Sequence, residues 1–323
     1  MQKELLDKLR VITEEEAKIL DGNKKIEKDI YTAHNDFVID SKKMLDSGKL
    51  IDIRPHTRFA HFPKHRHNYI EIVYMCSGQT THIINDTSEV VLLAGDVLFL
   101  NQNAYQEIMP AGLDDIAVNF IVLPEFFDSV FPMLDEENIL RNFIIGNLRQ
   151  DSGRIDYLHF KVADVLPVQN LIENLVWSIL NKQANKRHMN QVTMGLLFLQ
   201  LLNYTEKLDS NSPKQYEQNQ VLKILQSIEE NYQNISLTEI AESTNQSVYH
   251  LSRLIKENTG STFKDLVQKK RLNQAVYLLT TTNLTVDDII YRVGYENTSY
   301  FYRIFKKRYK MTPSEFRDRQ KLV

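Results

Sequence analysis

Two histidines and a glutamate stand close together in the stretch 65-HRHNYIE-71. His65 and His67 are separated by one residue, so in an extended segment both side chains lie on the same side, and Glu71 shares their parity. Two imidazoles and one carboxylate form a ligand set that zinc, manganese or iron would accept. The chain has a single cysteine, which excludes an internal disulfide and a metal site built on cysteine pairs.

The spacing His-x-His-x3-Glu, followed by Gly78, resembles the first motif of the cupin family. The resemblance implies a third histidine after Gly95, where this chain has Asn101, Asn103 and Gln106 instead. A glutamine is a neutral and weak ligand for a transition metal. A metal held by the two histidines and the glutamate is therefore the less favoured interpretation, and we expect no cofactor.

We expect these side chains to line a pocket that hydrogen-bonds a polar small molecule such as a sugar. The candidate pocket residues are His65, His67, Glu71, Gln106, Tyr69, Tyr74 and His82. Two alternatives stay open. The histidines could merely complete hydrogen bonds at the mouth of a barrel, or they could bind a metal in a cupin enzyme, an isomerase or dioxygenase, with an appended DNA-binding module.

The elements around these residues are short runs of β-branched and aromatic residues separated by turn residues. Many short strands at close spacing favour a small antiparallel barrel or sandwich. The expected strands are 58–62, 69–76, 80–85, 88–93, 96–101 and 115–123, with an edge strand around 157–162. Further along, 168–181 and 190–208 have helical patterns, and the second is apolar nearly all round. Such a helix must be buried on several sides, against its own barrel or against a partner subunit.

Charge is distributed unevenly along the chain. The formal net charge is -3, but from Lys214 onward there are 17 basic and 12 acidic residues, or +5, which leaves -8 for the rest. A polar segment at 209–215 with one proline coincides with this change of charge. The C-terminal third is therefore a basic module joined to an acidic one, which favours nucleic acid as its partner.

An internal repeat lies in this basic third. The segment 236-SLTEIA-241 aligns with 285-TVDDII-290, and 251-LSRLIK-256 aligns with 301-FYRIFK-306. Capping boxes are expected at Ser236 and Thr312, and a weaker version at Thr285. Asn245 and Gly294 lie in the turns and are the residues best able to adopt positive φ. A short helix, a tight turn and a longer helix, repeated, is the pattern of two helix-turn-helix units.

The outward faces of the two longer helices carry residue types that recognise DNA. Arginine can bind a guanine edge with two hydrogen bonds, hydroxyls and amides read other bases, and lysines neutralise phosphates. We expect Val248, Leu251, Leu254 and Ile255 to face inward in the first of these helices. The phosphate contacts are expected at Lys256, Lys306, Lys307 and Arg308.

The stretch 286-VDDIIYRVGYENTSYFYRIFKKRYKMTPSEFR-317 follows the signature of the AraC/XylS family of bacterial transcription regulators, so residues 216–320 resemble that family's DNA-binding domain. The resemblance implies two units reading adjacent segments of the major groove. Carried over by position, the base contacts are Tyr249, Ser252, Arg253, Thr298, Ser299 and Arg303. The first unit departs from the family pattern, because Asn245 and Gln246 replace the usual glycine-containing turn.

The fold class expected is α+β: an N-terminal cupin-like antiparallel β-barrel with flanking helices, followed by an all-α domain of two helix-turn-helix units joined by a long helix. The expected domains are a helical extension at 1–48, an effector-binding and dimerisation domain at 49–208, a linker at 209–215 and the DNA-binding domain at 216–323. No signal peptide or membrane-spanning segment is recognisable, so we expect a cytoplasmic protein.

The expected function is that of a non-enzymatic regulator controlled by a small molecule, with promoter DNA as partner. We also expect a homodimer, and contact with RNA polymerase if the chain is an activator. A third interpretation makes the barrel a dimerisation scaffold without a ligand. The sequence does not distinguish activation from repression.

Overall fold

The computed structural model describes residues 1–22, 25–33, 36–130, 156–181, 183, 185–209 and 213–320. The described residues divide into two compact units, with the division between Asn219 and Gln220. The expected linker at 209–215 lies just before this point, and its residues 210–212 are outside the described part of the chain. None of the described helices is both long enough and apolar enough to cross a membrane.

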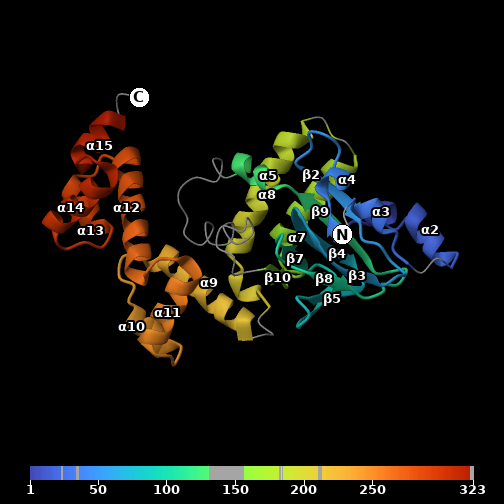
Figure 1. Ribbon diagram of the computed structural model, residues 1–323. Coiled ribbons are helices and arrows are strands. Elements are labelled where there is room, and N and C mark those ends of the chain that lie inside the picture. Colours follow the sequence, from blue (N-terminus) through green and yellow to red (C-terminus); the bar gives the residue numbers. More distant parts are fainter. Residues whose placement is uncertain are drawn as a thin grey trace. The chain divides into compact units, whose positions relative to one another are not determined.

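The first unit is built on two five-stranded sheets (Figure 1). One sheet has the order β1-β3-β8-β5-β6 and the other the order β10-β7-β4-β9-β2. Among the described strands, all pairings are antiparallel except that of β1 with β3. The strands are β1 (Val38–Ile39), β2 (Ile51–Pro55), β3 (Phe62–His67), β4 (Ile70–Ser77), β5 (Gln79–Ile84), β6 (Ser88–Leu93), β7 (Val97–Leu100), β8 (Gln106–Ile108), β9 (Ile116–Val122) and β10 (Tyr157–Phe160).

The predicted cupin-like β-architecture is confirmed. The strand expected at 58–62 is wrong, because only Phe62 of that run is in a strand and β3 continues to His67. Strands β1, β2 and β8 were not predicted, since runs of two to five residues without clear alternation give little periodic signal.

The two faces of β4 pack against different parts of unit 1. Val73 and Met75 belong to an apolar cluster that continues through Ile84 of β5, Leu98 of β7 and Ala117 of β9. Glu71 shares the parity of Val73 and Met75, so its side chain lies on the same face of the strand. Residues of the other parity face the helices that cover the sheet.

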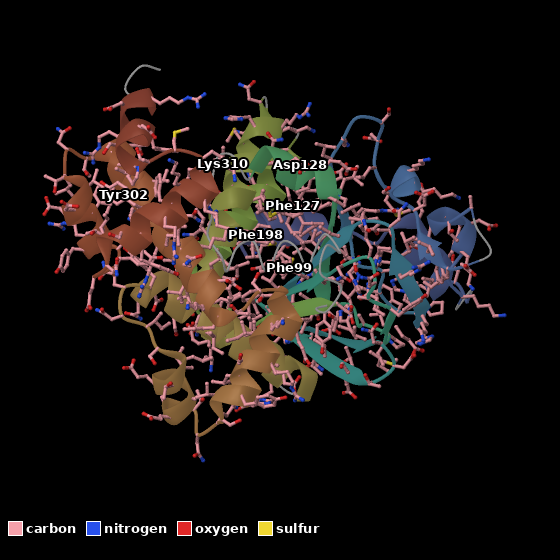
Figure 2. All side chains as sticks on the ribbon, turned by 60° about the vertical axis from the view of Figure 1, so that its left-hand side comes forward. Phe99, Phe127, Asp128, Phe198, Tyr302 and Lys310 are labelled. Carbon is pink, nitrogen blue, oxygen red and sulfur yellow. The ribbon has the colours of Figure 1, made fainter. Side chains whose placement is uncertain are left out.

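Those covering helices are α5 (Pro124–Val130), α7 (Leu166–Leu180) and α8 (Lys186–Leu202). Phe198 of α8 packs with its ring centroid 5.4 Å from that of Phe99 on β7 and 5.3 Å from that of Phe127 on α5 (Figure 2). The helix predicted to be buried on several sides therefore packs one face on its own chain. Its opposite face leaves Met189, Val192 and Leu196 between 39% and 46% exposed.

The N-terminal segment belongs to the same compact unit. It forms α1 (Lys3–Leu9), α2 (Glu14–Leu20), α3 (Lys28–Tyr31) and α4 (Ser41–Met44). A buried ion pair attaches α2 to the barrel: Arg58 donates from Nε to Glu16 Oε1 at 2.7 Å and from Nη2 to Glu16 Oε2 at 2.9 Å. Because the pair is bidentate and almost completely buried, it fixes both the position and the direction of α2.

The second unit is entirely helical over its described residues. Its helices are α9 (Pro213–Asn231), α10 (Leu237–Ser243), α11 (Val248–Thr259), α12 (Phe263–Thr281), α13 (Val286–Arg292), α14 (Thr298–Tyr309) and α15 (Pro313–Gln320). Helix α9 begins within unit 1 and continues into unit 2. An apolar cluster of unit 2 joins α12, α13 and α14 through Leu279, Ile290, Phe301 and Phe305.

Candidate DNA-binding helices and effector pocket

The first helix-turn-helix unit consists of α10 and α11. Ser236 caps α10 by accepting from the backbone N–H of Thr238, but its own backbone N–H does not donate to the Glu239 carboxylate, so the capping box predicted here is wrong. In the turn, Asn245 has a φ of +53°, as predicted. Ser247 then caps α11 by accepting from the backbone N–H of His250. These local bonds define where each helix begins.

The second helix-turn-helix motif consists of α13 and α14, with the predicted positive φ of +86° at Gly294. A Cβ at this position would lie 2.5 Å from the backbone oxygen of Gln233, so the turn needs glycine for its conformation and for its close approach to the segment after α9. Thr285 caps α13, and Asn297 caps α14 by accepting from the backbone N–H of Tyr300. The capping box predicted at Thr312 is confirmed, because Thr312 and Glu315 exchange both bonds.

All six predicted base-contacting residues are exposed and lie on α11 or α14. Tyr249 is 79% exposed, so its ring is accessible on the surface of α11. The Arg303 guanidinium lies 5.2 Å from the ring centroid of Tyr300, whose hydroxyl accepts from Gln268. Val248 was expected to face inward but is 42% exposed, because it is the first residue of α11 and lies beyond the buried Leu251–Ile255 stripe.

Within unit 2, helix α12 connects the two helix-turn-helix motifs. Its 19 residues correspond to about 28 Å at 1.5 Å per residue. A hollow beside α12 and α14, of about 780 Å³, is lined by four cations: Lys269, Arg303, Lys307 and Arg308. Among the described lining residues the one acid is Asp265, which forms a capping box with Thr262 at the start of α12. The four cations make this hollow strongly basic.

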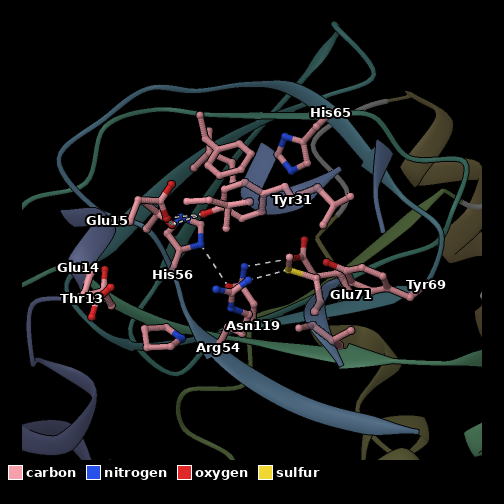
Figure 3. Close-up of a pocket in the computed structure, with 18 residues that line it drawn as sticks. Thr13, Glu14, Glu15, Tyr31, Arg54, His56, His65, Tyr69, Glu71 and Asn119 are labelled. Carbon is pink, nitrogen blue, oxygen red and sulfur yellow. Dashed lines mark hydrogen bonds between the residues drawn. The ribbon is translucent and has the colours of Figure 1, made fainter. Parts of the chain in front are cut away.

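Unit 1 contains a cavity of about 300 Å³ between the barrel and the N-terminal segment (Figure 3). Among the predicted pocket residues, His65, Tyr69 and Glu71 line it. Its apolar wall is formed by Ile30, Ile39, Met44, Phe62, Ile108 and Ile121. Further polar lining residues, which sequence reasoning missed, are Thr13, Glu14, Glu15, Tyr31, Arg54, His56, Thr57 and Asn119.

A chain of hydrogen bonds fixes the wall of this cavity. Glu71 accepts from Asn119 Nδ2 at 3.0 Å and from Gln106 Nε2 at 2.5 Å. Asn119 Oδ1 can only accept, so His56 donates to it from Nδ1, and His82 donates in the same way to Gln106 Oε1. Figure 3 shows His56, Asn119 and Glu71 linked in this order. The neutral His56 ring therefore has its proton on Nδ1 and a lone pair on Nε2.

Burial governs the protonation of this cluster. It lowers the pKa of His65 to about 4 and that of His82 to about 3, so both rings are neutral near pH 7. The pKa of His56 is also lowered by burial, against its bond to Asn119. Burial raises the pKa of Glu71 to about 7, although the bonds from Gln106 and Asn119 favour the carboxylate. The cavity wall is thus close to neutral on the histidine side.

The remaining predicted pocket residues do not line the cavity. Gln106 and His82 lie behind Glu71 and orient it, as described above. His67 is buried against the rings of His65 and Tyr69, and neither of its ring nitrogens has a hydrogen-bond partner in the described part of the chain. Tyr74 has the opposite strand parity to Glu71, and its hydroxyl donates to Gln169 Oε1 of α7 at 2.6 Å. We therefore exclude Tyr74 from the lining.

The geometry does not assemble a complete metal site from the described residues. No group of three His, Cys, Asp or Glu side chains among them is arranged to hold an ion. The Nε2 atom of His67 is 3.5 Å from Glu71 Oε1, and His65 directs Nδ1 at the carbonyl oxygen of Pro63 at 2.8 Å. His65 Nε2 and the two His67 nitrogens have no hydrogen-bond partner among the described residues, but they and Glu71 do not converge in a group that could hold an ion.

Comparison with known proteins identifies both units. The profile of the AraC-like ligand binding domain matches residues 52–119, and that of a helix-turn-helix domain matches residues 240–319. The chain is 30% identical over 266 residues to the HTH-type transcriptional activator RhaR of Mannheimia succiniciproducens, covering 80% of this chain and 88% of that protein. This chain belongs to the AraC/XylS family. It is a DNA-binding transcription regulator with an N-terminal ligand-binding domain, as the motif resemblances predict.

Other relatives match either most of the chain or its C-terminal part. The HTH-type transcriptional activator RhaS of the same organism is 26% identical and covers 79% of this AraC-family chain and 89% of the relative. Among solved structures, ToxT of Vibrio cholerae is 16% identical, covers 83% of this chain and 97% of that one, and has a TM-score of 0.34. The C-terminal domain of the response regulator yesN of Fusobacterium nucleatum is 37% identical and has a TM-score of 0.28. The match covers 29% of this chain and 94% of that domain.

Proposed function

We propose that this regulator is a cytoplasmic homodimer that binds promoter DNA through α11 and α14 and responds to a small hydroxylated molecule in the cavity of unit 1. It has no catalytic role in this proposal. Two of its relatives, RhaR and RhaS of Mannheimia succiniciproducens, are transcriptional activators, which supports activation and contact with RNA polymerase as the output.

The main support for DNA binding is the matched pair of exposed helices, α11 and α14. Helices α11 and α14 each have 12 residues, follow a positive-φ turn and present an arginine at the same repeat position, Arg253 and Arg303. Each arginine can bind the O6 and N7 atoms of a guanine, and the neighbouring hydroxyls can contact further bases. We assign the base contacts to Tyr249, Ser252, Arg253, Thr298, Ser299 and Arg303.

Phosphate contacts are assigned to exposed cations at the ends of the same helices. These are Lys256 on α11 and Lys306, Lys307 and Arg308 on α14. The basic hollow beside α12 adds Lys269 to this surface. Contacts of this kind position the protein on the duplex but carry no sequence information.

The effector class follows from the atoms that face the cavity. Glu15 Oε1 and His56 Nε2 are buried without a hydrogen-bond partner in the described part of the chain. Both are acceptors, and so is His65 Nε2, because the proton of that ring is on Nδ1, which bonds to Pro63. A ligand that satisfies them must donate several hydrogen bonds. A neutral polyhydroxylated molecule such as a carbohydrate does so while placing its C–H faces against the apolar wall.

Dimerisation is supported by the exposed face of α8. Met189, Val192 and Leu196 follow the i, i+3, i+7 spacing of one helix face, and Trp177 of α7 is also 42% exposed. An apolar stripe on a helix is normally covered by another surface. A second copy of the chain would cover it by two-fold symmetry.

DNA recognition is tested by selecting duplexes from a random library with the intact chain, then measuring affinity by gel shift. We expect a defined site, and a loss of preference at one or two base pairs for Arg253→Ala and for Arg303→Ala. Arg66→Ala, in unit 1, is the matched control and should bind like the parent chain. Selection of no common site at moderate salt would contradict the assignment of α11 and α14.

Effector binding is tested by thermal unfolding of the intact chain with a panel of monosaccharides. A ligand at 100 times its dissociation constant adds about 2.7 kcal/mol of stability. Glu15→Gln should weaken the response, and the exposed Glu4→Gln should not. If no sugar stabilises the chain, the scaffold without a ligand is favoured. Stoichiometric metal in the purified protein, lost on changing His65 and His67, would instead favour the cupin enzyme.

A further inference from the structure

Unit 1 has a second cavity, of about 170 Å³, where the beginning of α8 meets the start of β2 and α5. Among the described residues, none lines both this cavity and the effector cavity. Phe126 of α5, Ile179 of α7 and the apolar residues Leu50 and Ile51 form one side of it. The volume is below the roughly 300 to 1,000 Å³ of drug-sized sites, so it suits a small molecule.

Two buried amides also line this cavity. Asn190 is 3% exposed and Gln191 is 6% exposed, yet neither side chain makes a hydrogen bond within the described part of the chain. Buried amides are normally hydrogen-bonded, because removing them from water without a partner is unfavourable. A ligand in this cavity would supply the missing partner.

The electrostatics of the same site favour an anion. Helix α8 begins with Lys186 and Arg187, has no acidic residue in its first turn, and receives no side-chain cap from Asn185. Neither cation has an ion-pair partner in the part of the chain that the structure describes. Cations at the positive end of a helix are unfavourable, and an anion there is favourable. The other charged lining residues, Lys49 and Asp52, already pair with each other at 2.6 Å.

We propose that this cavity binds a small organic anion. Its charged group lies at the beginning of α8, between Lys186, Arg187 and the amides of Asn190 and Gln191. Its apolar body lies against Phe126 and Ile179. The site is separate from the effector cavity and does not depend on which molecule that cavity binds.

The test is calorimetric titration of the intact chain with benzoate, phenyl phosphate and benzamide. We expect saturable 1:1 binding of at least one of the two anions, with benzamide weaker by about tenfold or more, because charge-assisted hydrogen bonds are roughly twice as strong as neutral ones. Comparison of benzoate with phenyl phosphate identifies the preferred anionic group. Arg187→Gln should weaken binding by about tenfold, and Arg187→Lys should retain most of it. The exposed Lys42→Gln is the matched control and should leave binding unchanged.

Three results would overturn the proposal: no saturable binding of either anion, equal affinity for benzamide, or unchanged affinity in Arg187→Gln. A further variant, His56→Phe, changes the lining of the effector cavity and leaves the lining of the second cavity unchanged. If that variant loses anion binding while Arg187→Gln retains it, the anion binds in the effector cavity and the second site is refuted.

Discussion

The buried ion pair between Glu16 and Arg58 allows a direct test of how the effector cavity is closed. Helix α2 and its cap supply Thr13, Glu14 and Glu15 to the lining of that cavity, and Glu16 attaches the helix to the barrel. Replacing Glu16 by Gln removes the negative charge with little change of shape.

The expected cost follows from the bonds that the carboxylate accepts. It accepts from the backbone N–H of Thr13 at 2.9 Å, from the backbone N–H of Arg58 at 3.0 Å, and twice from the Arg58 guanidinium. Burial alone would raise the pKa of Glu16, but the bonds from Arg58 and Thr13 lower it overall, so the group is charged near pH 7. An amide has one acceptor oxygen, and its NH2 group would face donors. Breaking a buried pair from one side costs about 3–5 kcal/mol.

Hydrogen exchange measured by mass spectrometry is the appropriate assay, because it reports α2 separately from the barrel. A loss of about 3 kcal/mol should accelerate amide exchange in residues 14–20 by more than about 100-fold, and the affinity for an effector should fall with it. The control is Glu4→Gln, which removes an exposed ion pair with Lys8 and should change little. Replacing both Glu16 and Arg58 by apolar residues should restore part of the loss. Exchange in Glu16→Gln equal to that of the parent chain would refute this account of the attachment.

Further predictions concern DNA and stability. Arg303→Ala should lose about 1–3 kcal/mol of binding and relax preference at one site, whereas Lys306→Ala should weaken all sequences alike and reduce the slope of affinity against salt; identical behaviour of the two variants in gel shifts would contradict these roles. Gly294→Ala should destabilise unit 2 by about 1–3 kcal/mol in urea unfolding, because the added Cβ meets the oxygen of Gln233; an unchanged midpoint would show that the turn relaxes. The pKa of His65 is depressed to about 4, so its contribution to stability is present above pH 6.5 and is lost as the pH falls towards 4. Between pH 6.5 and pH 4 the free energy of unfolding of His65→Asn should therefore fall by about 3 kcal/mol less than that of the parent chain. Unfolding is measured by the fluorescence of the single tryptophan. Equal falls in the two proteins would show that His65 is not buried as a neutral ring.

Features that depend on neighbouring residues could be predicted from the sequence. The helix-turn-helix repeat is defined by caps and turns within a few residues, such as Asn245 and Gly294, and these positions have the predicted conformation. The failure at Ser236 is also local: its hydroxyl bonds to Thr238 instead of forming a reciprocal pair with Glu239. Local bonds of similar energy compete there, and the sequence does not rank them.

Features that depend on distant segments could not be predicted. Glu16 and Arg58 are 42 residues apart, so nothing near Glu16 indicates that α2 closes a cavity. Asn119 reaches Glu71 because β4 and β9 pair in a register with Asn119 opposite Val73, and register is a tertiary property. Tyr74 was assigned to the pocket by its nearness in sequence. Strand parity, combined with the position of α7, directs it to the opposite face.

Hydroxyl-radical footprinting of the intact chain on its selected DNA site tests the central claim most directly. We expect two protected segments about one helical turn, or 34 Å, apart. Arg253→Ala should reduce protection in one segment and Arg303→Ala in the other. A single protected segment, or the same loss in both variants, would contradict the assignment of α11 and α14 as two separate reading helices.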